Sequence, residues 1–370
     1  MRIVHTEASM GWGGQEIRVL DEIEGMRGRG HDVTLIAPET SRIMSEARRR
    51  SIPIAALPIG RKRLSGLLAM RRWLAANRVD VVNAHSSTDS WLAALACASL
   101  RHAPALVRTR HVSVPVGRDP GTRWLYTRAT AHIATTGENL RDALVRDSGI
   151  PPERVTSVPT GIDASRFKPG DRAAARATLG LPADWTLIGI VATLRSWKGH
   201  RFLFEAIASL LAARDRIGLV VVGDGPQRDS LQSLADTLDI KSRLFMPGNQ
   251  SDVLPWLRAL DIFALPSYAY EGVPQALVQA MLCGLPCVTT SIGAIPEAAV
   301  EGETAVVVKT QDAEDLARGI DLLIGDATLR VRLGAAARRR CEERFGYEAM
   351  LDRMEHIFYA ALNSRRPASA

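Results

Sequence analysis

The fold of this chain is decided by residues 266–289, which read PSYAYEGVPQALVQAMLCGLPCVT. A strand that ends near Pro266 is followed by a carboxylate, Glu271, then by a helix that Gly272 and Pro274 open, and then by a second apolar strand. This order is typical of an open parallel α/β sheet, whose ligands bind at the carboxyl ends of the strands. Glu271 is therefore a candidate for ligand binding, and the alternative is a carboxylate that only stabilises the start of the helix.

Short apolar runs alternate with amphipathic runs along most of the chain, which predicts parallel sheets covered by helices on both faces. Turn-forming residues interrupt this rhythm at residues 159–170. We therefore expect an α/β fold of two Rossmann-like doubly wound domains, at residues 1–165 and 166–347. A last helix, within residues 348–370, is expected to return to the first domain and to end in a disordered tail at residues 363–370.

The elements that this alternation predicts have lengths usual for an α/β protein. The expected strands lie at residues 2–6, 33–37, 79–83, 105–109, 132–135, 155–158, 186–191, 217–222, 243–246 and 304–308. The expected helices lie at residues 15–27, 64–76, 91–100, 139–146, 201–213, 227–238 and 348–362.

The charge of the 370-residue chain is unevenly placed. Residues 1–165 carry 23 Lys and Arg against 16 Asp and Glu, whereas the rest carries 24 against 24. The basic runs at residues 48–50, 61–63 and 71–72 form either a solvated face or a surface for an anionic membrane or acceptor. Nucleic acid is not expected, because no aromatic residues are interleaved with these charges.

The localisation that the sequence predicts is cytoplasmic, with peripheral contact at the inner membrane face as the further expectation. The chain opens with a strand-like run, and no apolar run approaches the roughly 20 residues that span a bilayer.

Two cations, Arg195 and Lys198, stand directly before the helix expected at residues 201–213. A helix N-terminus carries partial positive charge, so cations there are unfavourable unless an anion joins them. Backbone amides and these two side chains would suit a diphosphate. The alternative is a pair of solvated surface charges.

Other candidate residues follow predicted strands. Gly13 and Gly14 join the first strand to a helix and permit close approach of a ligand, although a plain tight turn explains them too. His85 and His111 each follow a strand, and Arg110 is a candidate for an anionic acceptor or an ordinary ion pair. A lone histidine is more often a structural hydrogen-bonding group than a catalyst.

Several of these segments, in this order along the chain, resemble the retaining GT-B glycosyltransferases of family 4. The matching segments are PTGID at residues 159–163, GDGP at 223–226, the helix with GLP from Glu271 to 286, and GAIPE at 293–297. Two positions depart from the family pattern, because Gln279 stands where the family has a second Glu and Thr193 where it has an Arg. The resemblance implies that the two domains face each other across a cleft.

The resemblance also implies roles for individual residues. Glu271, with the backbone at Gly272 and Val273, would hold the donor sugar, and Gln279 would face the ribose of the nucleotide. A neutral amide offers one acceptor oxygen where a carboxylate offers two. The remaining implied contacts are Lys198 and Arg195 on the diphosphate, His111 near the reacting sugar, and Gly13, Gly14, Gly223 and Gly293 as close backbone approaches around the donor.

The activity that follows from the resemblance is retaining transfer of a sugar from a nucleoside-diphosphate donor to a glycan or lipid-linked acceptor. Bacterial envelope polysaccharide or lipopolysaccharide assembly is the expected setting. No cofactor and no metal are expected, because the sequence has no Asp-x-Asp triplet and no cluster with metal-ligand spacing. The alternatives are a hydrolysing sugar-nucleotide epimerase of the same fold and a nucleotide-sugar-binding protein with weak or lost activity.

Overall fold

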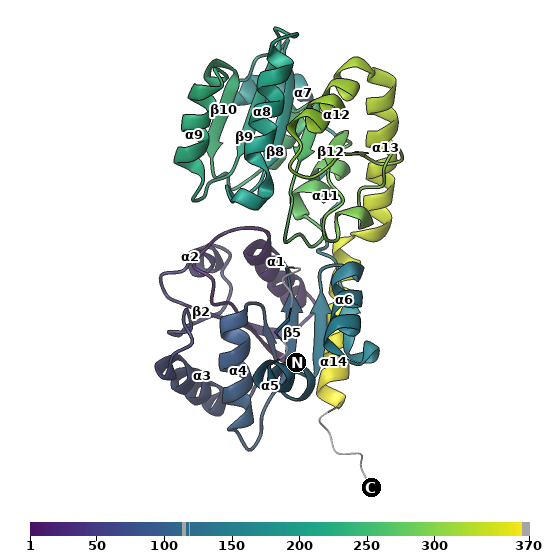
Figure 1. The fold of residues 1–370 in the computed structure, drawn as a ribbon. Coiled ribbons are helices and arrows are strands. Elements are labelled where there is room, and N and C mark those ends of the chain that lie inside the picture. Colours follow the sequence, from purple (N-terminus) through teal and green to yellow (C-terminus); the bar gives the residue numbers. More distant parts are fainter. Residues whose placement is uncertain (113–115, 118, 365–370) are drawn as a thin grey trace. The chain divides into compact units, whose positions relative to one another are not determined.

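The computed structural model describes residues 1–112, 116–117 and 119–364. The chain forms two compact units, one from Met1–Gly161 with the segment that begins at Glu348, the other from Ile162–Tyr347 (Figure 1). The division expected from the sequence, after residue 165, falls four residues later than this one. Of the expected disordered tail, Asn363 belongs to the last helix, and residues 365–370 lie outside the described residues.

The first unit is built on a parallel sheet. Its described residues form seven strands in the order β3-β2-β1-β4-β5-β6-β7. The registers are continuous, with Ile3 opposite both Val33 and Val81, and Val81 in turn opposite Ala105. The strands are β1 (Arg2–Thr6), β2 (Asp32–Ala37), β3 (Ile54–Ala56), β4 (Val81–Ala84), β5 (Ala105–Arg110), β6 (His132–Thr135) and β7 (Val155–Ser157).

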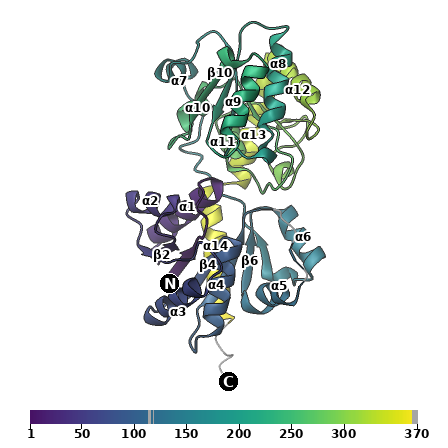
Figure 2. The same cartoon turned by 60° about the vertical axis from the view of Figure 1, so that its left-hand side comes forward.

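Helices cover both faces of this sheet (Figures 1 and 2). The strands are therefore buried on both sides, and β4 is buried at every position. The helices of this unit are α1 (Gly14–Gly28), α2 (Arg42–Arg49), α3 (Leu64–Ala76), α4 (Ser87–Ala98), α5 (Pro120–Trp124), the π-helix η1 (Leu125–Ala129), α6 (Glu138–Ser148), the short η2 (Pro152–Arg154) and α14 (Tyr347–Asn363).

The second unit repeats this plan. The part of the chain that the structure describes gives it six parallel strands in the order β10-β9-β8-β11-β12-β13. Strand β9 is buried along its whole length and pairs with β8 over six residues, from Ile217 opposite Thr186 to Val222 opposite Val191. The strands are β8 (Thr186–Val191), β9 (Ile217–Val222), β10 (Leu244–Gly248), β11 (Ile262–Leu265), β12 (Cys287–Thr289) and β13 (Val306–Val307).

The helices of the second unit again lie on both faces of the sheet (Figures 1 and 2). Pairs of them also pack on one another, among them α8 with α12, α11 with α13 and α7 with α10. They are α7 (Arg172–Leu179), the short η3 (Ser196–Lys198), α8 (His200–Leu211), α9 (Arg228–Thr237), η4 (Lys241–Arg243), α10 (Leu254–Ala259), α11 (Gln275–Leu282), η5 (Ile295–Glu297), α12 (Ala313–Gly325) and α13 (Ala327–Arg344).

The strand order gives each unit one point at which the chain reverses its direction of travel across the sheet. In the first unit this point lies between β1 and β4, and in the second between β8 and β11. In open α/β sheets, the ligand-binding crevice forms at such a switch point, outside the carboxyl ends of the strands. The loops that follow β1, β4, β8 and β11 are therefore the places where the fold itself puts ligand-binding residues.

The last helix, α14, is held on the first unit by charge and by apolar packing. Arg29 lies 2.7 Å from carboxylate oxygens of both Glu348 and Asp352, and His31 lies 2.7 Å from Glu355. On the apolar face of α14, the ring of Phe358 is fully buried. The expected return of the final helix to the first domain corresponds to this packing.

Close packing of α13 against the turn after α11 depends on a glycine. A Cβ on Gly334 would lie 2.2 Å from the carbonyl oxygen of Gly284, a contact that backbone atoms must move to relieve. We expect Gly334→Ala to lower the free energy of unfolding by about 1–3 kcal/mol, the usual effect of overpacking. Urea unfolding would measure it.

The control for this substitution is Gly325→Ala, at the end of α12, where an added Cβ meets nothing within 4 Å. Its stability should equal that of the wild type or exceed it slightly, because alanine is the better helix former. Equal stability of the two variants would show that the contact at Gly334 is relieved at little cost.

Candidate functional site

The loops at the switch point of the second unit bring two predicted residues into direct contact. Lys198, which follows β8, places its Nζ 2.6 Å from Oε1 of Glu271, which follows β11. The same carboxylate oxygen accepts a hydrogen bond from Oγ of Ser267 at 2.6 Å. Glu271 is buried, whereas Lys198 remains partly exposed. The pair thus presents a cation and a carboxylate together at the sheet edge where ligands bind.

Backbone packing between the two loops fixes this pair. A Cβ on Gly199 would lie 2.1 Å from the carbonyl oxygen of Pro266, and Gly199 has a φ of +77°, so only glycine fits without strain. Two residues before Gly199 and two residues after Pro266, the amide of Tyr268 donates to the carbonyl of Trp197 at 2.9 Å. Lys198 is therefore held between two backbone contacts to the loop that carries Glu271.

The backbone around Glu271 is itself unusual. Tyr270 has a φ of +61°, a left-handed conformation that is rare for an aromatic residue. Its ring packs edge-on against Trp197, with centroids 5.7 Å apart. On the other side, a Cβ on Gly293 would lie 2.0 Å from the carbonyl oxygen of Glu271. Backbone strain of this kind concentrates at functional sites, which supports a role in binding for this loop.

Glycine also allows the β8 and β9 loops to meet. Gly223 has a φ of +144°, and a Cβ there would lie 2.0 Å from the carbonyl oxygen of Ala192. The two glycines predicted from the sequence thus make close backbone contacts at the same sheet edge as the ion pair. Gly223 contacts the backbone after β8, and Gly293 contacts the backbone of Glu271.

The helix that follows Glu271 buries the other predicted residues. Gly272 and Val273 are buried, and Gln279 on α11 is only 9% exposed, so Gln279 is not a polar residue of the helix surface. The N-cap of α11 is Pro274, three residues after Glu271. Glu271 therefore does not act as a simple helix-start carboxylate, because it is held by Lys198 and Ser267 instead.

Arg195 lies apart from this ion pair. Its guanidinium stacks over the ring of Trp197 at 5.5 Å from the centroid, and the residue is exposed. Helix α8 begins at His200, which is buried, and burial together with the charge of Lys198 lowers the pKa of His200 to about 3. The N-terminus of α8 therefore carries a neutral histidine behind Lys198, which leaves the lysine as the cation nearest to Glu271.

The loop after β1 in the first unit carries a carboxylate, Glu7, that was not among the candidates predicted from the sequence. Glu7 is fully buried and accepts hydrogen bonds from the backbone of Ser9 at 2.8 Å and from Gln15 at 2.5 Å. Burial, with the charges of Asp89 and Glu16, raises its pKa to about 8. Its position directly after the first strand was the available signal. The two glycines predicted from the sequence lie where α1 begins. Gly13 is the N-cap of this helix, and Gly14 is its first residue, seven residues after Glu7.

The two histidines predicted after β4 and β5 lie in contact with each other. Nδ1 of His85 is 3.0 Å from Nε2 of His111, and a third histidine, His5 of β1, extends the row. His5 is not a candidate on sequence grounds, since only the strand order places β1 beside β4. Arg110 donates to the hydroxyl of Tyr126 and lies over its ring, so part of its charge is used within the unit.

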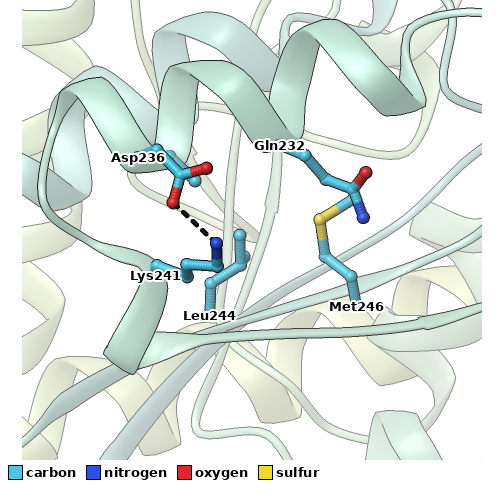
Figure 3. Close-up of a pocket in the computed structure, with 6 residues that line it drawn as sticks. Gln232, Asp236, Lys241, Leu244 and Met246 are labelled. Atoms are coloured by element: carbon cyan, nitrogen blue, oxygen red, sulfur yellow. Dashed lines mark ion pairs between the residues drawn. The ribbon is translucent and has the colours of Figure 1, made fainter.

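A separate pocket lies elsewhere on the second unit, between α9 and β10 (Figure 3). Its volume is about 340 Å³, and it contains none of the predicted site residues. An ion pair of 2.9 Å between Lys241 and Asp236 closes one side of it. It is lined by Gln232, Ala235, Asp236, Lys241, Leu244 and Met246.

Two family models match the chain, one for each unit. Glycosyltransferase Family 4 matches residues 12–166, and Glycosyl transferases group 1 matches residues 171–340. Together they extend over the greater part of both units described above. Among the described helices, none is long and apolar enough to cross a membrane.

Curated relatives agree with these matches. A D-inositol 3-phosphate glycosyltransferase of Streptomyces bingchenggensis is 31% identical over 312 residues, which cover 78% of this chain and 68% of the relative. The protein of that name from Rhodococcus opacus is 33% identical over 289 residues, or 76% of this chain. The match spans only 62% of the length of the Rhodococcus protein.

Solved structures show the same fold at low sequence identity. Anabaena Alr3699/HepE in complex with UDP-glucose superposes with a TM-score of 0.85 at 21% identity, covering 97% of this chain and all of the other. WaaG, a glycosyltransferase involved in lipopolysaccharide biosynthesis, superposes with a TM-score of 0.75 at 18% identity, covering 96% and 99%. Both solved structures thus share the two-unit architecture of this chain, which is the GT-B fold.

The raised pKa of Glu7 predicts a pH-dependent stability. An unfolded glutamate releases its proton near pH 4.5, whereas the folded chain keeps the proton on Glu7 up to about pH 8. The folded state therefore binds more protons within this window and loses stability as pH rises through it, by at most about 1.4 kcal/mol per pH unit. We expect Glu7→Gln to remove this loss, so that its stability advantage over the wild type grows from pH 5 to pH 8.

Urea unfolding of both proteins at several pH values would measure this difference. Glu39→Gln, at an exposed position of the same unit, is the control and should not alter the slope. Parallel stability curves for the wild type and Glu7→Gln would contradict the assignment of a protonated Glu7.

Proposed function

The chain belongs to the glycosyltransferases of family 4 and group 1, and on this premise we propose that it transfers a sugar from a nucleoside-diphosphate donor to a glycan or lipid-linked acceptor hydroxyl, with retention of configuration. The observation that carries the proposal is the ion pair of Lys198 and Glu271 at the β8/β11 switch point. The solved relative that binds UDP-glucose supports a nucleotide sugar as the donor.

Donor binding would redistribute the charges of this pair. A carboxylate accepts hydrogen bonds from vicinal hydroxyls, so Glu271 would turn to the sugar while Lys198 turns to the diphosphate. Before the donor binds, Lys198 and Glu271 neutralise each other, so neither leaves an unpaired charge at this partly buried position. The site is thus electrostatically balanced before the donor arrives, and its charges meet those of the donor afterwards.

The departing diphosphate is where catalysis needs positive charge. Lys198 and the N-terminus of α8 would stabilise it, and Arg195 would contribute once it leaves its place over Trp197. Gln279 would contact the ribose, with Gly272, Val273, Gly223 and Gly293 giving backbone access, and His111 would contact the reacting sugar. Preorganised cations of this kind do the electrostatic work that a metal does in other transferases, so we propose a reaction without metal or other cofactor.

Loss of either partner of the ion pair should abolish most of the activity. We expect Glu271→Gln and Lys198→Met each to lower donor turnover at least about a hundredfold, as removal of one preorganised electrostatic group commonly does. The measurement is release of the nucleoside diphosphate with a panel of donors and acceptors, with and without a chelator, which should not reduce the rate.

Lys241→Met is the matched control, since Lys241 is also an ion-paired lysine of the second unit but lies in the separate pocket. It should turn over donor like the wild type. Wild-type rates in the Glu271 and Lys198 variants would refute the catalytic assignment. Product analysis without acceptor separates transfer from the hydrolysing epimerase, and absence of turnover with every acceptor would favour a binding protein.

The acceptor and the setting of the reaction belong to the same proposal. The likeness to WaaG supports envelope polysaccharide or lipopolysaccharide assembly as the setting. The names of the curated relatives favour a second class of acceptor, a phosphorylated polyol, and Arg110 after β5 is a cation that such an acceptor could meet. An acceptor panel should therefore contain both lipid-linked glycans and inositol phosphates.

A basic surface on the first unit supports peripheral contact with the cytoplasmic face of an anionic membrane. Helix α3 exposes Leu64 and Leu68, which are 69% and 42% accessible. Arg71 and Arg72 follow on the same exposed side of the helix, and the basic run at residues 61–63 precedes it. An exposed apolar pair with basic residues before and after it is suited to the headgroup region of a membrane. There each cation adds about 1 kcal/mol to the binding free energy.

Substitution of the two arginines should weaken this contact. We expect Arg71→Gln together with Arg72→Gln to reduce binding to vesicles that contain anionic lipid by tenfold or more, at about 1 kcal/mol for each charge. Cosedimentation with vesicles measures it. Arg214→Gln with Arg216→Gln, on the second unit, removes the same charge and should leave binding unchanged; an equal loss in both double variants would mean that only net charge matters.

A further inference from the structure

A row of three histidines runs through the first unit along its central strands. His5 lies in β1, His85 directly after β4, and His111 directly after β5, and these strands are neighbours in the sheet. Nδ1 of His5 lies 2.9 Å from Nε2 of His85, and Nδ1 of His85 lies 3.0 Å from Nε2 of His111. The three rings therefore form one continuous hydrogen-bonded chain, which we call the histidine row.

The inner end of the histidine row faces a buried carboxylate. Nε2 of His5 lies 3.9 Å from Oε1 of Glu22, and Arg18 lies 3.6 Å from the other carboxylate oxygen. All three of these side chains are fully buried. Asn83 donates to Glu22 at 3.1 Å and accepts from Thr109 at 2.9 Å, which fixes the carboxylate in place. Nε2 of His5 makes no hydrogen bond among the described residues, so the row stops 3.9 Å short of Glu22, an acidic group that solvent does not reach.

The outer end of the row is open. His111 is partly exposed, and its Nε2 is occupied by His85. Throughout residues 1–112, 116–117 and 119–364, no hydrogen-bond partner meets its Nδ1. Thr136 donates to the backbone carbonyl of His111 at 3.3 Å and so steadies the residue. Nδ1 of His111 is therefore the atom that the row presents to a ligand.

Neutral imidazoles make such a row directional. Each ring has one N–H donor and one acceptor nitrogen, so every bond in the row must point the same way. Burial is the main cause that lowers the pKa of each of the three histidines, with the charge of Arg18 adding to it. The rings are accordingly neutral near pH 7, and the direction of the row is decided at its inner end.

We propose that the ionisation state of Glu22 determines, through the positioning residues His5 and His85, whether Nδ1 of His111 accepts or donates a hydrogen bond toward a bound ligand. An ionised Glu22 favours an N–H on Nε2 of His5, because a lone pair facing a carboxylate is repelled. Every ring then carries its proton on Nε2, and Nδ1 of His111 is an acceptor. A protonated Glu22 that turns to close the 3.9 Å gap donates to Nε2 of His5, every ring reverses, and Nδ1 of His111 becomes a donor.

The two states differ by one proton, and the row accounts for it. A proton that binds Nδ1 of His111 releases the proton on Nε2 to His85, His85 releases one to His5, and His5 releases one to Glu22. The carboxylate ends as a neutral acid, and no imidazolium remains in the buried row. Burial raises the pKa of Glu22 to about 7, against the opposing charge of Arg18, so both states are accessible near neutral pH.

Other charged and apolar groups lie around the histidine row, but none of the groups named below takes the place of Glu22 beside Nε2 of His5. Arg18 and Glu22 come from α1, and Asp89 of α4 accepts the backbone N–H of His85 at 2.9 Å. From α14, the ring of Phe358 packs edge-on against His5 at 6.2 Å and is apolar. The side chain of His5 therefore has a single carboxylate within ion-pair distance among the described residues, and that carboxylate is Glu22.

The tautomer of His111 can be read directly by nuclear magnetic resonance of protein with ¹⁵N-labelled histidine. The chain has eight histidines, and the spectrum of His111→Gln identifies the signals of His111. In the wild type we expect the Nε2–H tautomer above pH 7 and the Nδ1–H tautomer below it. A single titration near pH 7 changes their ratio about a hundredfold between pH 6 and pH 8.

In Glu22→Gln this pH dependence should disappear, because the amide has no proton to gain in that range. His5→Asn tests the row itself, since the amide keeps a partner for His85 but cannot pass a proton from one side to the other. Glu46→Gln, which removes another buried carboxylate of the first unit, should titrate like the wild type. Urea unfolding of each variant checks that the first unit is folded.

A single tautomer of His111 across pH 5.5 to 8.5 in the wild type would overturn the proposal, and so would a titration that persists in Glu22→Gln or His5→Asn. The inference rests on the proposed function only in taking the ligand of His111 to be the donor sugar. Unchanged turnover in His111→Gln would refute that role and leave the tautomer result standing, so the two failures are distinguishable.

Discussion

One ion pair, between Lys198 and Glu271, ties together the loops on the two sides of the switch point in the second unit. Much of the local structure serves this contact: Gly199 lets the β8 loop reach the backbone of Pro266, and Gly293 lets a third loop reach the carbonyl of Glu271. Because these are backbone contacts at glycine, the pair is positioned by the main chain and not by flexible side chains. A charge pair whose backbone is held in this way needs only its side chains to turn when a charged ligand separates them.

The two units use the same topology for different chemistry. In the second unit, the loops after β8 and β11 carry opposite charges that neutralise one another. In the first, the loops after β1, β4 and β5 carry Glu7 and two members of the histidine row. Burial raises the pKa of Glu7 and lowers the pKa of the two histidines, so it favours the neutral form of each group. The first unit therefore gathers proton-exchanging groups and the second gathers fixed charge, although the order of their strands is alike.

Much of this could be predicted from the sequence, and the failures have physical causes. The expected strands at 186–191 and 217–222 coincide with β8 and β9, because strands buried on both faces are continuous apolar runs. Helix α7 was not predicted: Arg176 is the residue that it buries, with hydrogen bonds to Ala259 and Asp261, and apolar periodicity does not detect such a helix. At the site, Glu271 followed from its place after a strand and Lys198 from its place before a helix, whereas Ser267 and His5 depended on neighbours that only the folded chain brings close.

The packing of Phe358 against His5 joins the last helix of the sequence to the first strand. A ribosome therefore releases the second unit, complete within residues 162–347, before it releases the helix that covers the histidine row. Until that helix has emerged, His5 lacks the apolar cover of Phe358, and its low pKa depends on burial. The first unit, although its strands are made first, is the later of the two to reach its final form, which reverses the usual N-to-C order in which domains mature.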